Sequence, residues 1–241
     1  KEGPYAFKHN NKYYLTFPWV QDKTETLAYA MADSPMGPFT FTGIIMDESP
    51  SGCWTNHHSI TEYNGQWYLF YHHNDYSPNF DKNRSARIDS LFFNTDGTIK
   101  KVKPTLRGVG ITDARSKIQI DRYSTISPYG VTIDYLEPSN TFEGWQTLFN
   151  RAGTWVTYNK VDFGTTPVKR LKARVRSEKG GAITLRTPGE KGMTIAELPI
   201  KPTGKWTEIS TNVSNAPTSM QDLIITQTGE NPVAVDWISF E

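Results

Sequence analysis

Hydrophobic and polar residues alternate in short runs along the whole chain, and turn-forming residues separate the runs. Early examples are "KYYLTFP", "TLAYAMA", "SITEYN", "QWYLFYH" and "ARIDSLFFN". They are bounded by "HNN", "SPMGP", "YNG" and "NTDG", which favour tight connections between strands. No early segment repeats its apolar residues with the period of a helix. The pattern therefore predicts an all-β protein.

The first part of the chain also contains an internal repeat. When Glu2 is aligned with Asn56, "EGPYAFKHNNKYYLTF" matches "NHHSITEYNGQWYLFY", with Asn, Tyr and Leu residues at equivalent places. The similarity continues further along the chain, where "AMADSP" of the first copy matches "ARIDSL" of the second. Repeats of several strands at such a period are typical of β-propeller blades. Two hairpins of a sandwich that resemble each other by chance are the alternative.

The pattern changes around residues 101–116, where "KVKPTLRGVGITDARS" has the Pro and Gly residues of a connector. Beyond it, short strands such as "TWVTYNKVDFG", "GAITLRTP" and "VAVDWISFE" are separated by Gly, Pro and Asn turns. This spacing predicts an antiparallel β-sandwich of roughly 120 residues. We therefore expect two domains, at residues 1–112 and 113–241.

Composition narrows the range of partners. Charged residues make up 21% of the chain, aromatic residues 13%, and the net charge is +1, as expected of a folded domain without an electrostatic footprint for nucleic acid. The most basic segment, "VKRLKARVR", alternates apolar with basic residues, which indicates a strand with one solvated face. No apolar run approaches the ~20 residues of a membrane span. One cysteine, Cys53, excludes an intrachain disulfide.

The repeat places polar residues at equivalent points of its two copies. Glu2 and the Asn56-His57 pair each stand just before the first strand of a predicted blade, where side chains reach the central channel of a propeller. The Gly3-Pro4 step stiffens the turn after Glu2. We expect Glu2 and His57 to face one hollow. A glutamate exposed at a frayed terminus is the alternative.

Several segments within residues 1–110 carry a resemblance to a known family. They are "EGPYAFKHNNKYYLTF", "LAYAMADSPMGPF", "CWTNHHSITEYNGQWYLFYHHN" and "SLFFNTDGTIKKVKPTLRGVG", and they resemble the C-terminal part of a glycoside hydrolase family 43 domain. The resemblance implies a five-bladed propeller, of which about two blades are present. It also implies an inverting hydrolase for xylose- or arabinose-containing plant glycans, either a β-xylosidase or an α-L-arabinofuranosidase, and an extracellular or periplasmic location.

The resemblance implies roles for particular residues. Glu2 matches the family's general acid, a protonated carboxyl that donates to the leaving oxygen. His57 matches a histidine that holds a water-coordinated ion or polar network beneath the sugar. Arg84 matches an arginine that binds substrate hydroxyls. Trp54 could stack on a sugar face or simply pack in its loop.

Inverting hydrolysis also needs an opposed carboxylate roughly 6.5–9.5 Å away, with room for a water between. The family's two aspartates belong upstream of Glu2. By the pattern, the remaining aspartates lie in turns or at solvent-facing positions; they are Asp22, Asp33, Asp47, Asp75, Asp81 and Asp89. We therefore expect the chain to be inactive alone, as a truncated sequence or as one piece of a split enzyme completed by an N-terminal propeller segment.

Two neighbouring pairs of histidines are less well assigned. His58 follows His57 directly, so the sequence leaves open which of the two faces inward. His72 and His73 are expected to finish a strand.

The second domain resembles carbohydrate-binding module family 6 through "IQIDRY", "GTWVTYNKVDFG", "GGAITLR", "TGKWTEI" and "VDWISF". The resemblance implies a jelly-roll sandwich that stacks glycans on aromatic residues at one rim. The matching positions are Phe149 and Trp206, with Asn231 as a polar partner. It also implies a structural calcium ion with oxygen ligands, held by Gln119, Asp121 and Asp236. A module kept only to support the propeller is the alternative.

Three functions therefore stay open. The first is a hydrolase of plant cell-wall glycans or oligosaccharides, and the second is a non-catalytic carbohydrate-binding protein. The third is a structural fragment that oligomerises to cover unpaired strand edges. The first two differ in whether a companion segment supplies the missing base.

Overall fold

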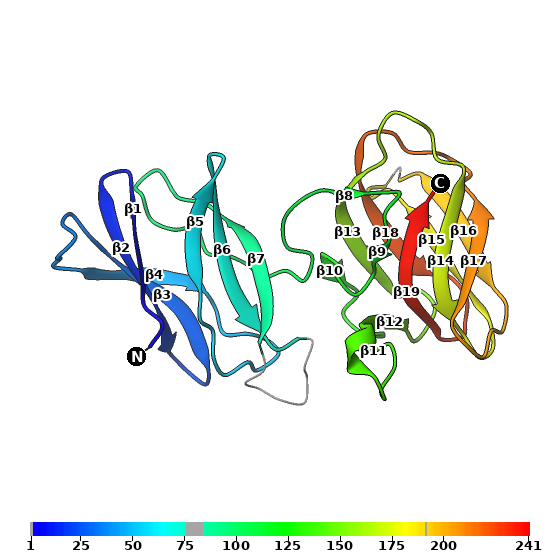
Figure 1. Cartoon of the computed structure of the whole chain (residues 1–241), viewed down its shortest axis with the longest axis horizontal. Helices are drawn as coiled ribbons and strands as arrows, with labels where there is room; N and C mark the ends of the chain where they lie inside the picture. The colour runs from blue at the N-terminus through cyan, green and yellow to red at the C-terminus, as the bar shows by residue number, and fades with distance from the viewer. Residues whose placement is uncertain (1, 76–83, 191) are drawn as a thin grey trace. The chain divides into compact units, whose positions relative to one another are not determined.

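The computed structural model describes residues 2–75, 84–190 and 192–241, and Figure 1 shows that strands dominate them. The all-β prediction is confirmed. The chain divides into two compact units, Lys1–Val109 and Gly110–Glu241. Within the described residues, no helix has the length and apolar character that crossing a membrane requires.

The N-terminal unit begins with a four-stranded antiparallel sheet in the order β1-β2-β3-β4. Its strands are β1 (Tyr5–His9), β2 (Lys12–Val20), β3 (Glu25–Ala32) and β4 (Thr40–Met46). Asn10 and Asn11 connect β1 to β2 with φ values of 46° and 60°. Positive φ at both central positions defines the hairpin turn that asparagine and glycine adopt most readily.

The second sheet of this unit has three strands in the order β5-β6-β7. They are β5 (Ser59–Tyr63), β6 (Gln66–His73) and β7 (Ser85–Leu91). Asn64 and Gly65 form the β5–β6 turn with φ values of 51° and 78°. The repeated asparagine in the sequence therefore marks the same turn in both sheets.

One apolar cluster holds the two sheets together. Phe7 stacks on Tyr14 with ring centres 4.6 Å apart, and the Tyr14 hydroxyl donates to the Gly97 carbonyl at 2.6 Å. The cluster consists of Tyr14, Leu27, Tyr29, Ile45, Met46, Ile60, Leu69, Tyr71, Leu91, Ile99 and Val102. Val102, from the start of the connector, thus belongs to the core of the N-terminal unit together with Ile99.

Asp89 departs from its expected solvent-facing position. Its side chain is buried and accepts hydrogen bonds from the Tyr71 hydroxyl at 2.6 Å and from the Thr105 amide and hydroxyl at 3.0 Å and 2.7 Å. A buried carboxylate is tolerated only when donors satisfy it. Asp89 therefore fastens the connector to β6 and β7.

The C-terminal unit is a sandwich of two sheets that are antiparallel except where β8 pairs in parallel with β13. One sheet has the order β10-β13-β18-β15-β16, with β8 pairing β13, and the other has the order β11-β12-β19-β14-β17, with β9 pairing β19. The strands of the first sheet are β8 (Thr112–Asp113), β10 (Thr125–Ile126), β13 (Trp155–Asp162), β15 (Gly181–Arg186), β16 (Thr194–Ile200) and β18 (Met220–Gln227). Those of the second are β9 (Ile118–Gln119), β11 (Val131–Tyr135), β12 (Trp145–Phe149), β14 (Arg170–Arg176), β17 (Thr207–Asn212) and β19 (Val233–Phe240). A 3-10 turn, η1 (Thr141–Glu143), lies between β11 and β12.

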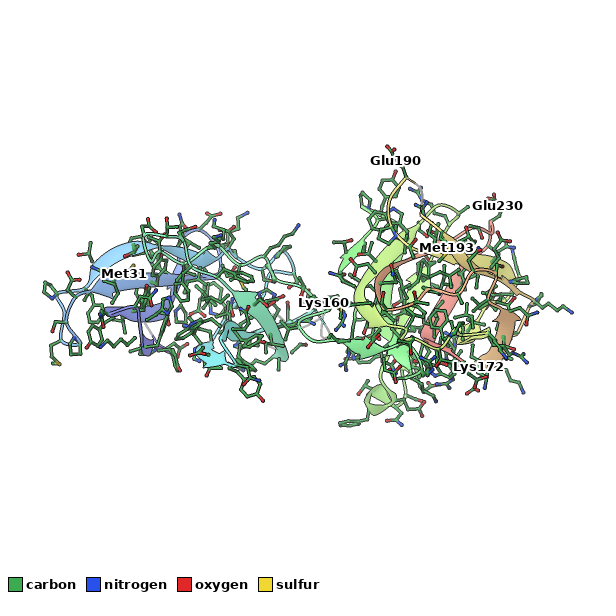
Figure 2. The ribbon with its side chains drawn as sticks, turned by 90° about the horizontal axis from the view of Figure 1, so that it is seen from above. Met31, Lys160, Lys172, Glu190, Met193 and Glu230 are labelled. Atoms are coloured by element: carbon green, nitrogen blue, oxygen red, sulfur yellow. The ribbon has the colours of Figure 1, made fainter. Side chains whose placement is uncertain are left out.

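Strand β14 shows how the alternation divides the second sheet into two faces. Leu171, Ala173 and Val175 are fully buried in the core between the sheets. The intervening basic residues lie on the outer face, where Lys172 is labelled in Figure 2. The predicted solvated face therefore exists.

Phe149 is not at the rim of the sandwich, where the sequence placed it. Its side chain is 0% exposed and belongs to the core between the two sheets, and its backbone pairs with Val131 and Val233. A side chain without exposed surface cannot stack on a glycan. The rim assignment of Phe149 is therefore wrong.

We expect Phe149→Ala to lower the free energy of unfolding of the C-terminal unit by about 3–5 kcal/mol, because it removes a buried ring and leaves a cavity. Chemical denaturation measures this change. The matched control is Phe142→Ala, since Phe142 is 99% exposed and should change stability by less than about 0.5 kcal/mol. A Phe149 variant as stable as the control would contradict the core position.

Candidate functional site

Glu2 and His57 approach each other from the starts of the two sheets of the N-terminal unit. The Oε1 atom of Glu2 lies 3.5 Å from Nε2 of His57. Gly3 has a φ of 60° and packs against the imidazole, because a Cβ at this position would be 3.1 Å from Cγ and Cδ2 of His57. Only glycine satisfies both the backbone angle and the close approach. The turn therefore sets the direction of the Glu2 carboxylate.

Hydrogen bonds from both sheets hold the segment that carries His57. The His57 amide donates to Nε2 of His72 at 3.0 Å. The Asn56 amide donates to Oε2 of Glu25 at 2.8 Å, and the Glu25 amide donates to the Trp54 carbonyl at 3.2 Å. Glu25 at the start of β3 thus fastens the entry to β5, a role that the sequence pattern did not indicate.

Two hollows flank this contact. The first, of about 570 Å³, is lined by Glu2, Pro18, Trp19, Val20 and Glu25. The second, of about 320 Å³, has both His57 and Arg84 in its lining. Trp54 is 41% exposed and lines neither of these hollows. The structure therefore brings Glu2 to His57, and His57 to the hollow of Arg84, and leaves Trp54 apart.

The structure separates the two adjacent histidines that the sequence left ambiguous. His57 is turned toward Glu2. Nε2 of His58 lies 2.6 Å from the Thr16 hydroxyl. His72 and His73 end β6, as expected, and both are buried. Burial lowers the pKa of His58, His72 and His73 to about 4 in each case.

None of the other described aspartates of this unit lines the hollow that contains Glu2. Asp33 and Asp47 form exposed ion pairs with Lys12 and Lys101. Asp75 binds Arg87 at 2.8 Å, and Asp81 lies outside the described residues. Apart from Glu2, Glu25 is the one carboxylate that the described residues contribute to the first hollow.

In the C-terminal unit, Trp206 and Asn231 border one outer surface. The Trp206 indole donates to the Leu136 carbonyl at 3.4 Å, and the guanidinium carbons of Arg174 and Arg176 lie 5.4 Å and 5.0 Å from its ring centre. Arg176 and Asn231 line a hollow of about 420 Å³. Arg176 therefore connects the ring of Trp206 with the hollow of Asn231.

Of the residues expected to hold calcium, Asp236 has cationic neighbours. The Asp236 carboxylate accepts a hydrogen bond from Arg174 at 2.7 Å, and Lys117 also lies close enough to influence it. Burial raises the pKa of Asp236. Gln119 pairs with Trp237 along β9 and β19, and Asp121 is buried. The described residues contain no group of three acidic, histidine or cysteine side chains that could hold a metal ion. Cationic neighbours of Asp236 oppose a bound cation.

Comparison with known families agrees with this division of the chain. Residues 1–99 match the model for glycosyl hydrolases family 43, and residues 127–241 match that for carbohydrate binding module family 6. Each unit belongs to one of these families. The N-terminal unit is thus part of a family 43 hydrolase domain, and the C-terminal unit is a family 6 module.

Individual relatives match either nearly the whole chain or less than half of it. An arabinoxylan arabinofuranohydrolase of Paenibacillus polymyxa is 28% identical over 95% of this chain and 40% of its own length. A beta-xylosidase of Xylanibacter ruminicola is 43% identical over 42% of this chain and 31% of its own length. The chain therefore spans well under half of these two relatives.

A solved structure supports the fold of both units. It is a family 43 arabinoxylan arabinofuranohydrolase from Bacillus subtilis in complex with cellotetraose, with a TM-score of 0.61 and 25% identity over 99% of this chain and 53% of that chain. The predicted combination of propeller blades followed by a β-sandwich is confirmed. The hydrolase unit contributes two blades, β1–β4 and β5–β7.

Sequence reasoning missed Glu25, Trp19 and Arg176. Glu25 opens an apolar strand and Trp19 belongs to an alternating one, so neither stands out. Arg176 continues the basic face of "VKRLKARVR", and this alternation was the available signal. Only the tertiary contacts give these residues a place beside Glu2 or Trp206.

We expect the hydrolase unit to lose stability as the pH falls from about 6.5 toward 4. The pKa of His58, His72 and His73 is about 4 in the folded chain, so in this window the unfolded chain binds more protons. Each extra proton costs about 1.4 kcal/mol per pH unit. Calorimetry between pH 7 and pH 5 measures the decline.

The module is an internal control for this measurement, because none of the five histidines lies in it. Its transition should move much less over the same range. Equal shifts of both transitions, or a hydrolase unit whose melting temperature stays constant, would show that the three histidines do not stay neutral in the folded chain.

Proposed function

We propose that this chain is part of an inverting glycoside hydrolase that cleaves O-glycosidic bonds in xylose- or arabinose-containing plant glycans, with Glu2 as the general acid. The observation that carries the proposal is the Glu2–His57 contact at 3.5 Å, held by Gly3 against the imidazole. The membership of the hydrolase unit in family 43 supports it. Because the substrates are polymers, we propose that the protein acts in an extracellular or periplasmic location.

The proposed chemistry is a single displacement. The protonated carboxyl of Glu2 donates its proton to the glycosidic oxygen as the bond from that oxygen to the anomeric carbon breaks. A water attacks the opposite face of the anomeric carbon and gives a proton to a carboxylate base. Among the described residues only Glu25 shares the Glu2 hollow, and its Oε2 already accepts from Asn56. We assign the base to an aspartate of an N-terminal propeller segment, as the family resemblance implies.

His57 has a separate role in this proposal. Its Nε2 is shielded from solvent and, apart from the ion-pair approach of Glu2 Oε1 at 3.5 Å, has no hydrogen-bond partner among the described residues. A shielded polar nitrogen of this kind is expected to form a hydrogen bond to a water, which can belong to the shell of a bound ion. His57 would thus hold the polar network beneath the sugar and orient Glu2, while Arg84 would bind substrate hydroxyls from the neighbouring hollow.

A second function is favoured by the module. We propose that it binds glycan at the surface bordered by Trp206 and Asn231. A partly buried indole against Arg176, which lines a hollow of about 420 Å³, suits a sugar face next to hydrogen-bonding groups. If the hydrolase segment is never completed by a base, the protein is a non-catalytic glycan binder.

We expect Glu2→Gln in the whole protein to lower kcat/KM by about 10²–10⁴ on oligosaccharides, whose sugar leaving group needs a proton. Dinitrophenyl glycosides, whose leaving group departs without protonation, should lose much less. The control is Glu62→Gln, because Glu62 is an exposed residue near the end of β5. An equal loss of kcat/KM on both substrates, or no loss on either, would show that Glu2 is not the general acid. This chain without a companion segment should turn over neither substrate.

For the module, titration of the chain with xylo-oligosaccharides tests the role of Trp206. We expect Trp206→Ala to weaken binding about 3- to 10-fold, because aromatic stacking contributes about 0.5–1.5 kcal/mol. Tyr129→Ala is the control, since Tyr129 is 65% exposed on a different loop. Unchanged affinity in the Trp206 variant would contradict the proposal that glycan binds at this surface.

A further inference from the structure

The hollow of the module is a groove that runs across the strands on the outer face of one sheet. Arg176 of β14 is paired with Ala234 of β19, and Ala234 is paired with Leu148 of β12. Gln146, two residues before Leu148, is paired with Asp134 of β11. All five residues line the groove. At about 4.8 Å between neighbouring strands, it spans roughly 14 Å from β14 to β11.

The two ends of the groove differ in chemistry. Arg176 lies at the β14 end, next to the ring of Trp206, and Lys179, three residues further along the chain, also lines the groove. The floor over β19 and β12 is formed by the small or apolar side chains of Ala234 and Leu148. Asp134 lies at the β11 end, where one of its oxygens accepts from the Tyr135 amide at 2.7 Å. A ligand lying along the groove therefore meets two cations and the Glu178 carboxylate at one end and the Asp134 carboxylate at the other.

Arg176 differs from the other basic residues of β14 in its partners. Arg174 is paired with Asp236 and Lys172 with Glu241, and Arg170 donates to the Ser210 hydroxyl. Among the described residues no carboxylate lies within the 4.0 Å ion-pair distance of Arg176. Arg176 lies over the Trp206 ring at 5.0 Å, a cation–π contact that restrains the guanidinium but does not neutralise it, and its charge also reaches the exposed Glu137 carboxylate from beyond ion-pair distance.

A guanidinium held in this way is suited to a planar anion. Its parallel N–H groups match the two oxygens of a carboxylate, and Lys179 adds a second positive charge in the same lining. Glu178 also borders the groove, so hydroxyl donors find acceptors there and at Asp134. The combination suits a sugar chain with many hydroxyls and one acidic group, rather than a small inorganic anion.

We propose that this groove recognises an acidic glycan, whose uronic acid carboxylate binds Arg176 while neutral sugars extend over Ala234 and Leu148 toward Asp134. The inference rests on the proposed glycan binding of the module and adds the class of glycan and the residue that selects it.

The test compares two ligands that differ only in the acidic group. The full chain is titrated by calorimetry with a xylotetraose that carries a glucuronic acid branch, and with the same oligosaccharide after its carboxyl has been reduced to a hydroxymethyl group. The acidic form should bind about 10-fold more tightly, and this preference should shrink as salt rises. Arg176→Gln should remove the preference, and Arg176→Lys should keep part of it.

The control variant is Arg186→Gln, because Arg186 is an exposed arginine on β15 of the other sheet, and it should keep the full preference. Equal affinity of the wild-type chain for both ligands would overturn the acidic selectivity and leave the glycan-binding function intact. Binding of neither ligand would overturn both proposals. A preference that survives in Arg176→Gln would show that Arg176 does not select the acid.

Discussion

The close contact between Gly3 and the imidazole of His57 is the constraint on which the hydrolase unit depends. It presses the backbone before β1 against the residue before β5, so the two blades meet where Glu2 and His57 face each other. Any side chain at position 3 would push the imidazole away, because a Cβ there would be 3.1 Å from ring atoms. The position of the carboxylate is therefore a property of two sheets together and not of the short segment that carries it.

Around this contact, buried and partly buried polar groups hold the segments of the unit together. Glu25 holds the Asn56 amide, Asp89 holds Tyr71 and Thr105, and the neutral ring of His72 accepts from His57. Each of these groups is costly to bury without its partner. Their hydrogen bonds fix the arrangement of the loops. Because several of these groups titrate, the arrangement is also sensitive to protonation.

In the module, the alternation of side chains along each strand decides which residues are buried. Its apolar residues face the core between the two sheets, which leaves the outer face of β14 to basic side chains. Two of these pair with carboxylates and Arg170 donates to the Ser210 hydroxyl, while Arg176 lies against Trp206. On one chain, a module that held a glycan would keep that glycan near the hydrolase unit at a raised effective concentration. The proposed selectivity for an acidic glycan would then bias which polymer regions are presented.

The sequence by itself determined the all-β class, the repeated hairpins and the basic face of β14, because strands alternate every second residue and turns need particular residues. It also pointed to Glu2 and His57 through their equivalent places in the repeat. It could not place Phe149 or Asp89, since both are buried by sheets distant in sequence. The choice between His57 and His58, the fastening by Glu25 and the contact of Arg176 with Trp206 likewise came only from the tertiary structure. These features depend on which side chains from other strands come within contact distance, and local alternation carries no information about that.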